Sequence, residues 1–489
     1  MSKRKKSKKS KSGKNRTPIS GHTRHGKELL PPFAKMAGTG KMAFSSWINE
    51  RLPEMIWAAL IREALGQDHA IGLFRRFLNY IGKHEKKALL SDITLTSLSK
   101  LDIALREEII AFIIEPPDVA GPLATLRLFE SLPARQSWDK LLPKIEPNLD
   151  LLMSAVGSNL WHQSQEATDC RWLRVMAQVV TGKFHIPEET AKNWFGYPNE
   201  GDQRSVRPSI RAAEIAPSSM DPPDLTWPNA FWEEAWHNTP CLALVKGGEI
   251  LHPDEVVTRG QIDKAKAALE EHWAKTHSTT AIDAKHDAVF GMALYSLRIL
   301  LELLGVGVGT SIIGRLGLRT ILEVRITLRY LLKNDDVKLW EKWRMYGAGQ
   351  AKLNALKFDD NIDPPKHIDI ESIERIAGED LWEEFLTINL GNWSGLDLRR
   401  LSEKADLKDV YDSHYSWTSG YTHGTWGPIR ESCYQTCGNP LHRLHRYPES
   451  RALAETVEDA AQIVDCILED VGIAYPSFTE RIGQKKEYK

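Results

Sequence analysis

Hydrophobic positions recur at helical spacing along most of the chain, and the clearest example is the segment 314–333. At about 100° per residue, its apolar side chains fall within an arc about 100° wide, the usual width of a core-facing stripe: Ile321, Val324, Leu328, Leu331 and Leu332. The opposite side of the segment carries polar and aromatic residues: Arg315, Arg319, Glu323 and Tyr330. The pattern predicts one long amphipathic helix.

Similar patterns, interrupted at glycine and proline, predict two further groups of helices. The first group is expected at 46–66, 69–82, 92–114, 121–132, 147–157 and 169–180. The second is expected at 259–277, 281–304, 314–333, 336–358, 370–378, 379–390, 405–423 and 451–472. The one convincing strand signal is a short hairpin from Cys241 to Leu251, turning on Gly247 and Gly248. The sequence therefore predicts an all-α protein with at most one small β-hairpin.

Changes in composition divide the chain into five segments. We expect a disordered basic tail (1–40), an irregular N-terminal helical domain (41–182), and a connection rich in proline and tryptophan (183–258). A C-terminal helical bundle (259–476) with the candidate site and a short C-terminal tail (477–489) complete the chain.

The charge of the chain is unevenly distributed. Residues 1–16 hold nine Lys and Arg and no acid, whereas the rest carries 55 basic and 65 acidic residues. A basic tail on an acidic body favours RNA or another polyanion as a partner. Five cysteines in 489 residues and an N-terminus without an apolar signal segment indicate a reducing, cytoplasmic setting. The longest apolar run, 303–314, is shorter than the roughly 20 residues of a membrane span, so no transmembrane helix is expected.

The polar side of the 314–333 helix has two interpretations. Arg319 and Glu323 are spaced i, i+4, so that their side chains can meet. They form either an ordinary solvated face or a face that a second element covers. The best candidate for that element is the segment 412–430, the densest cluster of His, Tyr, Ser and Thr in the chain.

In that segment His414 and Tyr421 share one face of a helix that is expected to end at His423. Gly424 is expected to stop the helix in a left-handed conformation. The two histidines are either structural or part of a site, and the chemistry of the protein, if any, is expected where the two segments pack together.

Two further motifs are weaker. The Gly305, Gly307 and Gly309 spacing is that of a phosphate-binding loop, but a helix precedes it instead of the required strand, which favours a helix–helix turn. Four residues of zinc-ligand type lie within thirteen positions: Cys433, Cys437, His442 and His445. Their spacing is unlike ordinary zinc sites, so a metal site is kept only as an alternative, and no cofactor is expected.

The run Arg319-Thr-Ile-Leu-Glu323 with Tyr330, together with Tyr421-Thr-His423-Gly, resembles an uncharacterised family of bacterial all-helical domains. Those domains are similar to the HEPN class of ribonucleases found in toxins and phage-defence proteins. The resemblance covers residues 285–472. It implies a helical bundle that often forms homodimers and cuts RNA without a metal, using an Arg and a His. That class has Arg followed after four to six residues by His, whereas the C-terminal domain of this chain has the reverse order, His423-x6-Arg430. Arg62-x6-His69 has the order of the class but lies outside residues 285–472.

The resemblance implies roles for particular residues. His423 or His414 would take the proton of a ribose 2′-hydroxyl, and Arg319 or Arg430 would stabilise the charge on the phosphate. Glu323 would orient an Arg or His. Tyr421 would donate to the phosphate or stack on a base. The alternatives are a module that binds RNA, a nucleotide or a protein without cleavage, and a helical scaffold.

Overall fold

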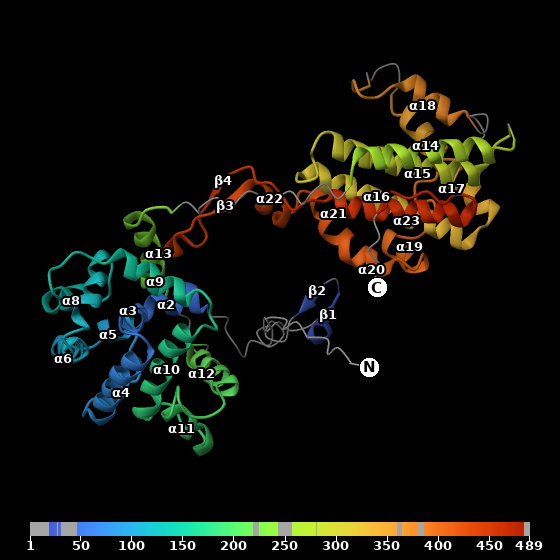
Figure 1. Cartoon of the computed structure of the whole chain (residues 1–489). Coiled ribbons are helices and arrows are strands. Elements are labelled where there is room, and N and C mark those ends of the chain that lie inside the picture. Colours follow the sequence, from blue (N-terminus) through green and yellow to red (C-terminus); the bar gives the residue numbers. More distant parts are fainter. Residues whose placement is uncertain are drawn as a thin grey trace, which may run out of the picture. The chain divides into compact units, whose positions relative to one another are not determined.

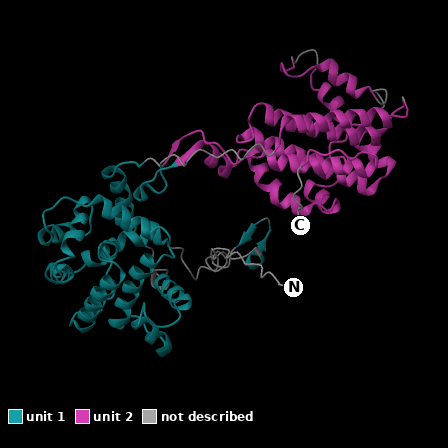
Figure 2. Ribbon diagram, viewed as in Figure 1, with its two compact units in different colours: residues 1–244, 436–445 teal, residues 245–435, 446–489 magenta. Residues whose placement is uncertain are grey.

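The computed structural model describes residues 19–26, 28–30, 46–218, 224–242, 257–279, 281–358, 364–379 and 386–483, which are mostly helical (Figure 1). Their arrangement confirms the all-α prediction. The chain divides into two compact units (Figure 2). Unit 1 comprises residues 1–244 and 436–445, and unit 2 comprises residues 245–435 and 446–489.

The described residues contain two small two-stranded sheets. The first pairs β1 (Thr23–His25) with β2 (Glu28–Leu30) in antiparallel register, inside the segment expected to be a tail. The second pairs β3 (Tyr434–Thr436) with β4 (Arg446–Pro448). The sequence pattern predicted neither, and most of the hairpin predicted at 241–251 lies outside the described residues.

Unit 1 is an irregular helical stack around one hydrophobic core. It contains a π-helical turn η2 (Trp47–Arg51), α2 (Leu52–Glu54), α3 (Ile56–Leu65), α4 (Gln67–Lys83), η3 (Lys87–Leu90), α5 (Leu95–Ser99), α6 (Ile103–Ile114), α7 (Ala120–Leu123), η4 (Ala124–Leu128), α8 (Arg135–Leu141), α9 (Leu149–Asn159), α10 (Gln165–Val180), α11 (Glu188–Phe195), α12 (Gln203–Ser218), α13 (Thr226–Asn238) and the 3₁₀ turn η7 (Pro440–His442). The long helix α10 is central and packs against α3, α4, α9 and α12. Leu441, from the loop between β3 and β4, is part of the same core.

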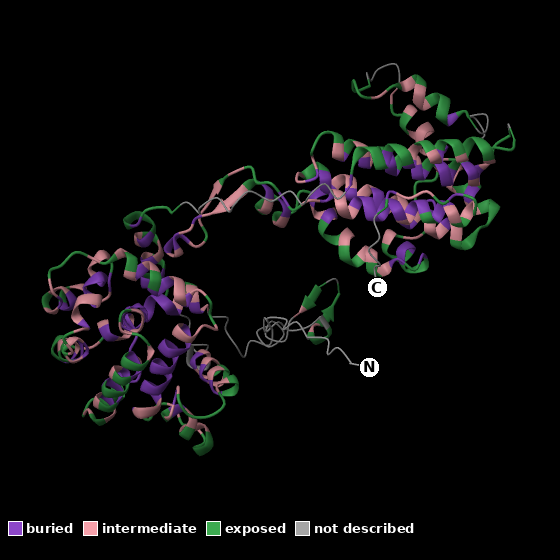
Figure 3. Ribbon diagram, in the orientation of Figure 1, coloured by how far each residue is buried: buried purple, intermediate pink, exposed green. Residues whose placement is uncertain are grey.

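Unit 2 is a bundle with α16 at its centre. Its helices are α14 (Arg259–Thr276), α15 (Ala284–Gly305), α16 (Ile312–Asn334), α17 (Val337–Ala355), α18 (Ile370–Ala377), α19 (Leu398–Lys404), α20 (Lys408–Val410), the π-helical turn η6 (Tyr411–Tyr415), α21 (Ser416–Thr422), α22 (Trp426–Cys433) and α23 (Val457–Ala474). α16 packs against α15, α17, α19, α21 and α23. Buried residues run along α16 and α23, while α14 presents exposed residues (Figure 3).

Three predicted helices of unit 2 differ from the structure. Residues 386–390, the described end of the helix predicted at 379–390, are not helical. The side chain of Asn389 there accepts a hydrogen bond from the Gly391 amide, a local turn that competes with helix formation. The helix predicted from 405 begins at 408, after the left-handed Asp406 (φ 57°). The last helix begins at Val457, six residues later than predicted, and residues 451–456 are not helical.

Helix α15 is the one described helix that is long and apolar enough to cross a membrane. Half of its most apolar window is buried within the protein, where α15 packs against α14, α16 and α23. A core helix of a globular bundle has these same properties.

Candidate functional site

Helix α16 is covered on its polar side as well as on its apolar side. The predicted stripe residues Ile321, Leu328 and Leu331 are fully buried. On the polar side, the Arg319 side chain is only 20% exposed and that of Glu323 37% exposed. The packing of α21 and η6 on α16 accounts for this coverage, and it agrees with the second interpretation of the polar face.

Arg319 joins α16 to the segment that carries the histidines. Its guanidinium is paired with Glu323 at 2.8 Å. It also donates to the Tyr415 hydroxyl at 2.9 Å and to Thr422 Oγ1 at 3.2 Å. The guanidinium carbon lies 5.1 Å from the centre of the Tyr415 ring, within the range of a cation–π contact. Arg319 is therefore held from both helices in one orientation.

Each candidate histidine is adjacent in sequence to a residue that contacts Arg319, Tyr415 in η6 or Thr422 in α21. His414 precedes Tyr415 in η6 and is half-buried. His423 follows Thr422 and is exposed at the end of α21, where Gly424 (φ 58°) stops the helix as predicted. The structure thus brings Arg319 and Glu323 together, and each histidine is adjacent in sequence to a residue that contacts Arg319.

Tyr421 belongs to a second polar group, formed with Glu431 and Arg315. Tyr421 is buried, and its hydroxyl donates to Glu431 of α22. Burial and Glu431 raise the pKa of Tyr421 to about 12, which further favours the protonated form that donates the hydrogen bond. Its ring lies 5.8 Å from the guanidinium of the buried Arg315. Arg430 is exposed on α22.

Sequence reasoning missed Tyr415, Thr422 and Glu431 as members of these two polar groups. Tyr415 and Thr422 are seven residues apart, and this spacing predicts that they share one helical face. Arg315 serves the turn between α15 and α16, because it donates to the Gly309 carbonyl at 3.0 Å. That turn confirms the helix–helix interpretation of the glycine motif, with Gly307 at φ 63°.

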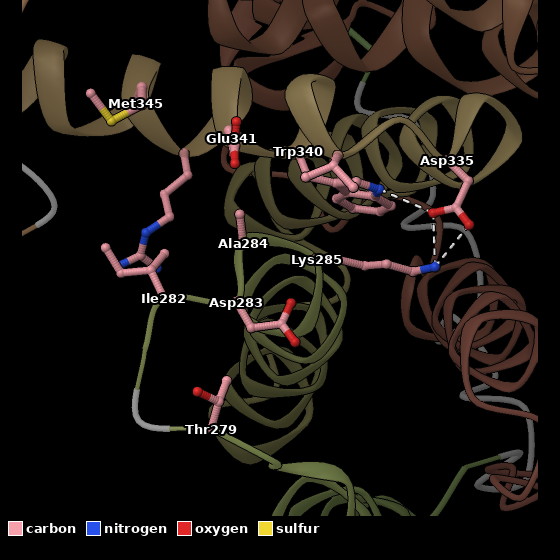
Figure 4. Close-up of a pocket in the computed structure, with 11 residues that line it drawn as sticks. Thr279, Ile282, Asp283, Ala284, Lys285, Asp335, Trp340, Glu341 and Met345 are labelled. Carbon is pink, nitrogen blue, oxygen red and sulfur yellow. Dashed lines mark hydrogen bonds and ion pairs between the residues drawn. The ribbon is translucent and has the colours of Figure 1, made fainter.

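A cavity of about 620 Å³ lies near the far end of α16, between the start of α15 and α17 (Figure 4). It is about 24 Å along the helix axis from Arg319, counting 1.5 Å per residue to Asp335. Lys285 lies 2.8 Å from Asp335, and the Trp340 indole donates to the same carboxylate at 3.2 Å. The arginine in its wall, Arg344, is paired with Asp287 at 2.5 Å. The cations that line the cavity thus each have an acidic partner, and the sequence did not predict this site.

A second cluster of reactive side chains lies in unit 1. The ligand-type atoms of Cys241, Cys437, His442 and His445 all lie within 4.8 Å of one another. Three of these residues belong to the set considered from the sequence. The fourth, Cys433, is exposed, and its sulfur lies 3.4 Å from the neighbouring Ser432 hydroxyl. Cys241, almost 200 residues away in sequence, takes its place.

Comparison with known protein families gives a match over part of the chain. Residues 308–436 match a family of unknown function (DUF5677), and this segment runs from the turn before α16 to β3. No curated protein and no solved structure matches the chain. The part of the chain that carries Arg319, Glu323 and the two histidines is therefore similar to a family whose function is unknown.

Proposed function

We propose that unit 2 is a HEPN-like domain that cleaves RNA without a metal ion, in a toxin or phage-defence setting. The observation that carries the proposal is the fixed position of Arg319, a largely buried cation. Its partners Tyr415 and Thr422 are each adjacent in sequence to a histidine. A guanidinium held in this way is suited to a phosphate, which it can bind through two parallel hydrogen bonds. The resemblance of the 319–323 and 421–424 motifs to HEPN-like domains supports the same assignment.

In the proposed reaction a ribose 2′-hydroxyl attacks the adjacent phosphorus, and the bond from phosphorus to the 5′-oxygen breaks. His423, exposed at the end of α21, takes the proton of the attacking hydroxyl. Arg319 stabilises the negative charge on the phosphate, with Glu323 holding the guanidinium in place. His414 returns a proton to the leaving 5′-oxygen. The products are a 2′,3′-cyclic phosphate and a 5′-hydroxyl.

Binding without cleavage is the second candidate, and one observation favours it. The guanidinium of Arg319 already contacts Glu323, Tyr415 and Thr422, so an incoming phosphate must share or replace these contacts. A site of this kind can hold an RNA or nucleotide phosphate without moving a proton.

Two other features are proposed to support RNA binding. The nine Lys and Arg of residues 1–16 add a non-specific attraction for the phosphate backbone. Homodimer formation, which the HEPN resemblance implies, would place two such sites on one RNA.

The test uses the full-length protein and a fluorescently labelled single-stranded RNA in the presence of a metal chelator. Cleavage by the native protein is expected to fall by about 10²-fold or more in His423→Ala, the loss typical for a general base. Arg319→Ala should lower it similarly. Arg298→Ala is the control, because Arg298 is an exposed arginine on α15 that pairs only at the surface.

RNA that stays intact with the native protein, or cleavage that His423→Ala leaves unchanged, argues against the ribonuclease. Fluorescence anisotropy on the same RNA separates the second candidate. Binding that is lost in Arg319→Ala, without cleavage by the native protein, supports a binding module.

A further inference from the structure

We propose that Cys241, Cys437, His442 and His445 of unit 1 bind one zinc ion as a structural site. These residues come from two segments: Cys241 follows α13, and the other three belong to the loop between β3 and β4. The site is independent of the proposed ribonuclease site, which lies in unit 2.

Three of the six distances among the four ligand atoms are close to those of a tetrahedral zinc site, and all six are 4.8 Å or less. With Zn–S of about 2.3 Å and Zn–N of about 2.05 Å, the sulfur and nitrogen ligands of a regular tetrahedron are about 3.5–3.6 Å apart. Nδ1 of His442 lies 3.5 Å from the Cys241 sulfur and 3.7 Å from the Cys437 sulfur. Nδ1 of His445 lies 3.6 Å from the Cys241 sulfur. One ion at the centre therefore reaches these atoms with little movement.

The hydrogen bonds around His442 leave its Nδ1 ready to bind a cation. The Thr239 hydroxyl lies 2.6 Å from the Ala235 carbonyl, to which it donates its one hydrogen. It accepts from the Asn439 amide at 3.1 Å, and it lies 3.0 Å from Nε2 of His442. Since the hydroxyl hydrogen is already used, Nε2 must be the donor and carries the proton. The lone pair is then on Nδ1, which faces both sulfurs, and the hydroxyl holds the ring as an outer-shell partner of a metal ligand does.

Backbone hydrogen bonds contribute to the position of the ligand loop. The Cys437 amide donates to the His445 carbonyl at 3.0 Å, and the Gly438 amide donates to the Leu242 carbonyl at 2.7 Å. The second bond ties the loop directly to the residue after Cys241. Leu441 is buried in the core of unit 1. The Trp236 ring packs against the rings of both histidines, with centroids 4.7 and 4.5 Å away.

Zinc is the ion that this set of ligands fits best. Two thiolates and two neutral imidazoles offset the charge of a divalent cation and match its preference for sulfur and nitrogen in a tetrahedron. Four protein ligands also close the coordination sphere, which is typical of structural sites and leaves no position for a substrate. A disulfide between Cys241 and Cys437 is the competing chemistry, but it makes no use of the two imidazoles.

The test is the metal content of the full-length protein, purified under reducing conditions and measured by elemental mass spectrometry. We expect about one zinc per chain in the native protein. The content should fall below a tenth of that in Cys437→Ser and in the double variant His442→Ala/His445→Ala. Cys433→Ser is the matched control, because Cys433 lies four residues before Cys437 and its side chain is outside the cluster. This control should keep its zinc.

A second measurement covers the case in which the variants fail to fold. Native protein is stripped with a chelator, reloaded with Co²⁺, and its visible absorption is compared with that of tetrahedral cobalt bound to thiolates. Zinc that is absent in the native protein, together with no such absorption after reloading, overturns the proposal. So does zinc retained in Cys437→Ser, or a Cys241–Cys437 disulfide found by peptide mass mapping under the same reducing conditions.

Discussion

The interior of unit 1 contains a buried charge cluster centred on Glu214, and Glu214→Gln tests how much it stabilises the unit. The Glu214 side chain is fully buried, with Arg51 at 2.5 Å, Arg174 at 2.7 Å and Arg171 at 3.6 Å. Their side chains are only 6%, 11% and 3% exposed. Burial lowers the pKa of Arg171 to about 10, which shows that its charged form is costly even beside the carboxylate.

Replacing the carboxylate by an amide of the same shape removes the negative charge that the three arginines share, while Asp92 still lies 3.4 Å from Arg174. Removal of one partner from a buried ion pair costs about 3–5 kcal/mol, because the remaining charge is left without compensation. Since about 1.4 kcal/mol is a factor of ten, amides protected by the unfolding of unit 1 should exchange about 10²-fold to several thousandfold faster.

Hydrogen–deuterium exchange measured by mass spectrometry can follow each unit separately. Peptides from α10, which carries Arg171 and Arg174, should show the acceleration, and peptides from α23 in unit 2 should not. Glu302→Gln is the control, because Glu302 pairs with Arg298 on the surface and its loss should cost less than about 1 kcal/mol. An acceleration in α10 below about fivefold would refute the reasoning, since it would mean that the arginines are compensated by other means.

Two predictions concern unit 2. Burial raises the pKa of Asp470 to about 6, although Arg329 lies 2.8 Å away. The native state therefore binds the proton of this carboxyl group more tightly than the unfolded chain does. The stability that this group contributes is lost as the pH rises from about 4 to 6. The free energy of unfolding of Asp470→Asn, measured by thermal unfolding, should therefore rise by about 2–3 kcal/mol relative to that of the native protein between pH 4 and 7.5. A difference between the two proteins that does not change with pH would contradict this. Gly314→Ala should lower the free energy of unfolding by about 1–3 kcal/mol, because its new methyl group would lie 2.6 Å from the Gly309 carbonyl oxygen. Gly347→Ala, in α17 with no atom near its Cβ position, should raise it by about 0.5–1 kcal/mol, and chemical unfolding that gives both variants the same sign would be evidence against the packing of α16.

The sequence pattern predicted most of the helices and several of their ends. The π-helical turn η2 begins at Trp47, directly after Ser46, whose hydroxyl accepts a hydrogen bond from the Asn49 amide and caps the turn. Helix α21 ends at Thr422, two residues before Gly424 (φ 58°), because glycine adopts a left-handed conformation without steric cost. These features depend on residues within a few positions of one another, and local sequence therefore contains the information for them.

The charged residues were harder to place, because the same i, i+4 spacing occurs on exposed and on covered faces. Arg298 and Glu302 have this spacing and are exposed, whereas Arg319 is largely covered. The difference lies in Tyr415 and Thr422, about 100 residues later, which pack over one pair and not over the other. Whether the histidines beside them act on RNA stays a prediction.

By itself the sequence determined that this chain is helical, where α16 runs, and which of its faces is apolar, since periodicity and caps act over one or two helical turns. Only the tertiary structure decided the partners of the polar side chains. Arg319 meets Tyr415 and Thr422, and the cysteine beside Cys437 is Cys241 and not the nearby Cys433. Such contacts depend on how distant segments pack into one core, and no local pattern records which segments will meet.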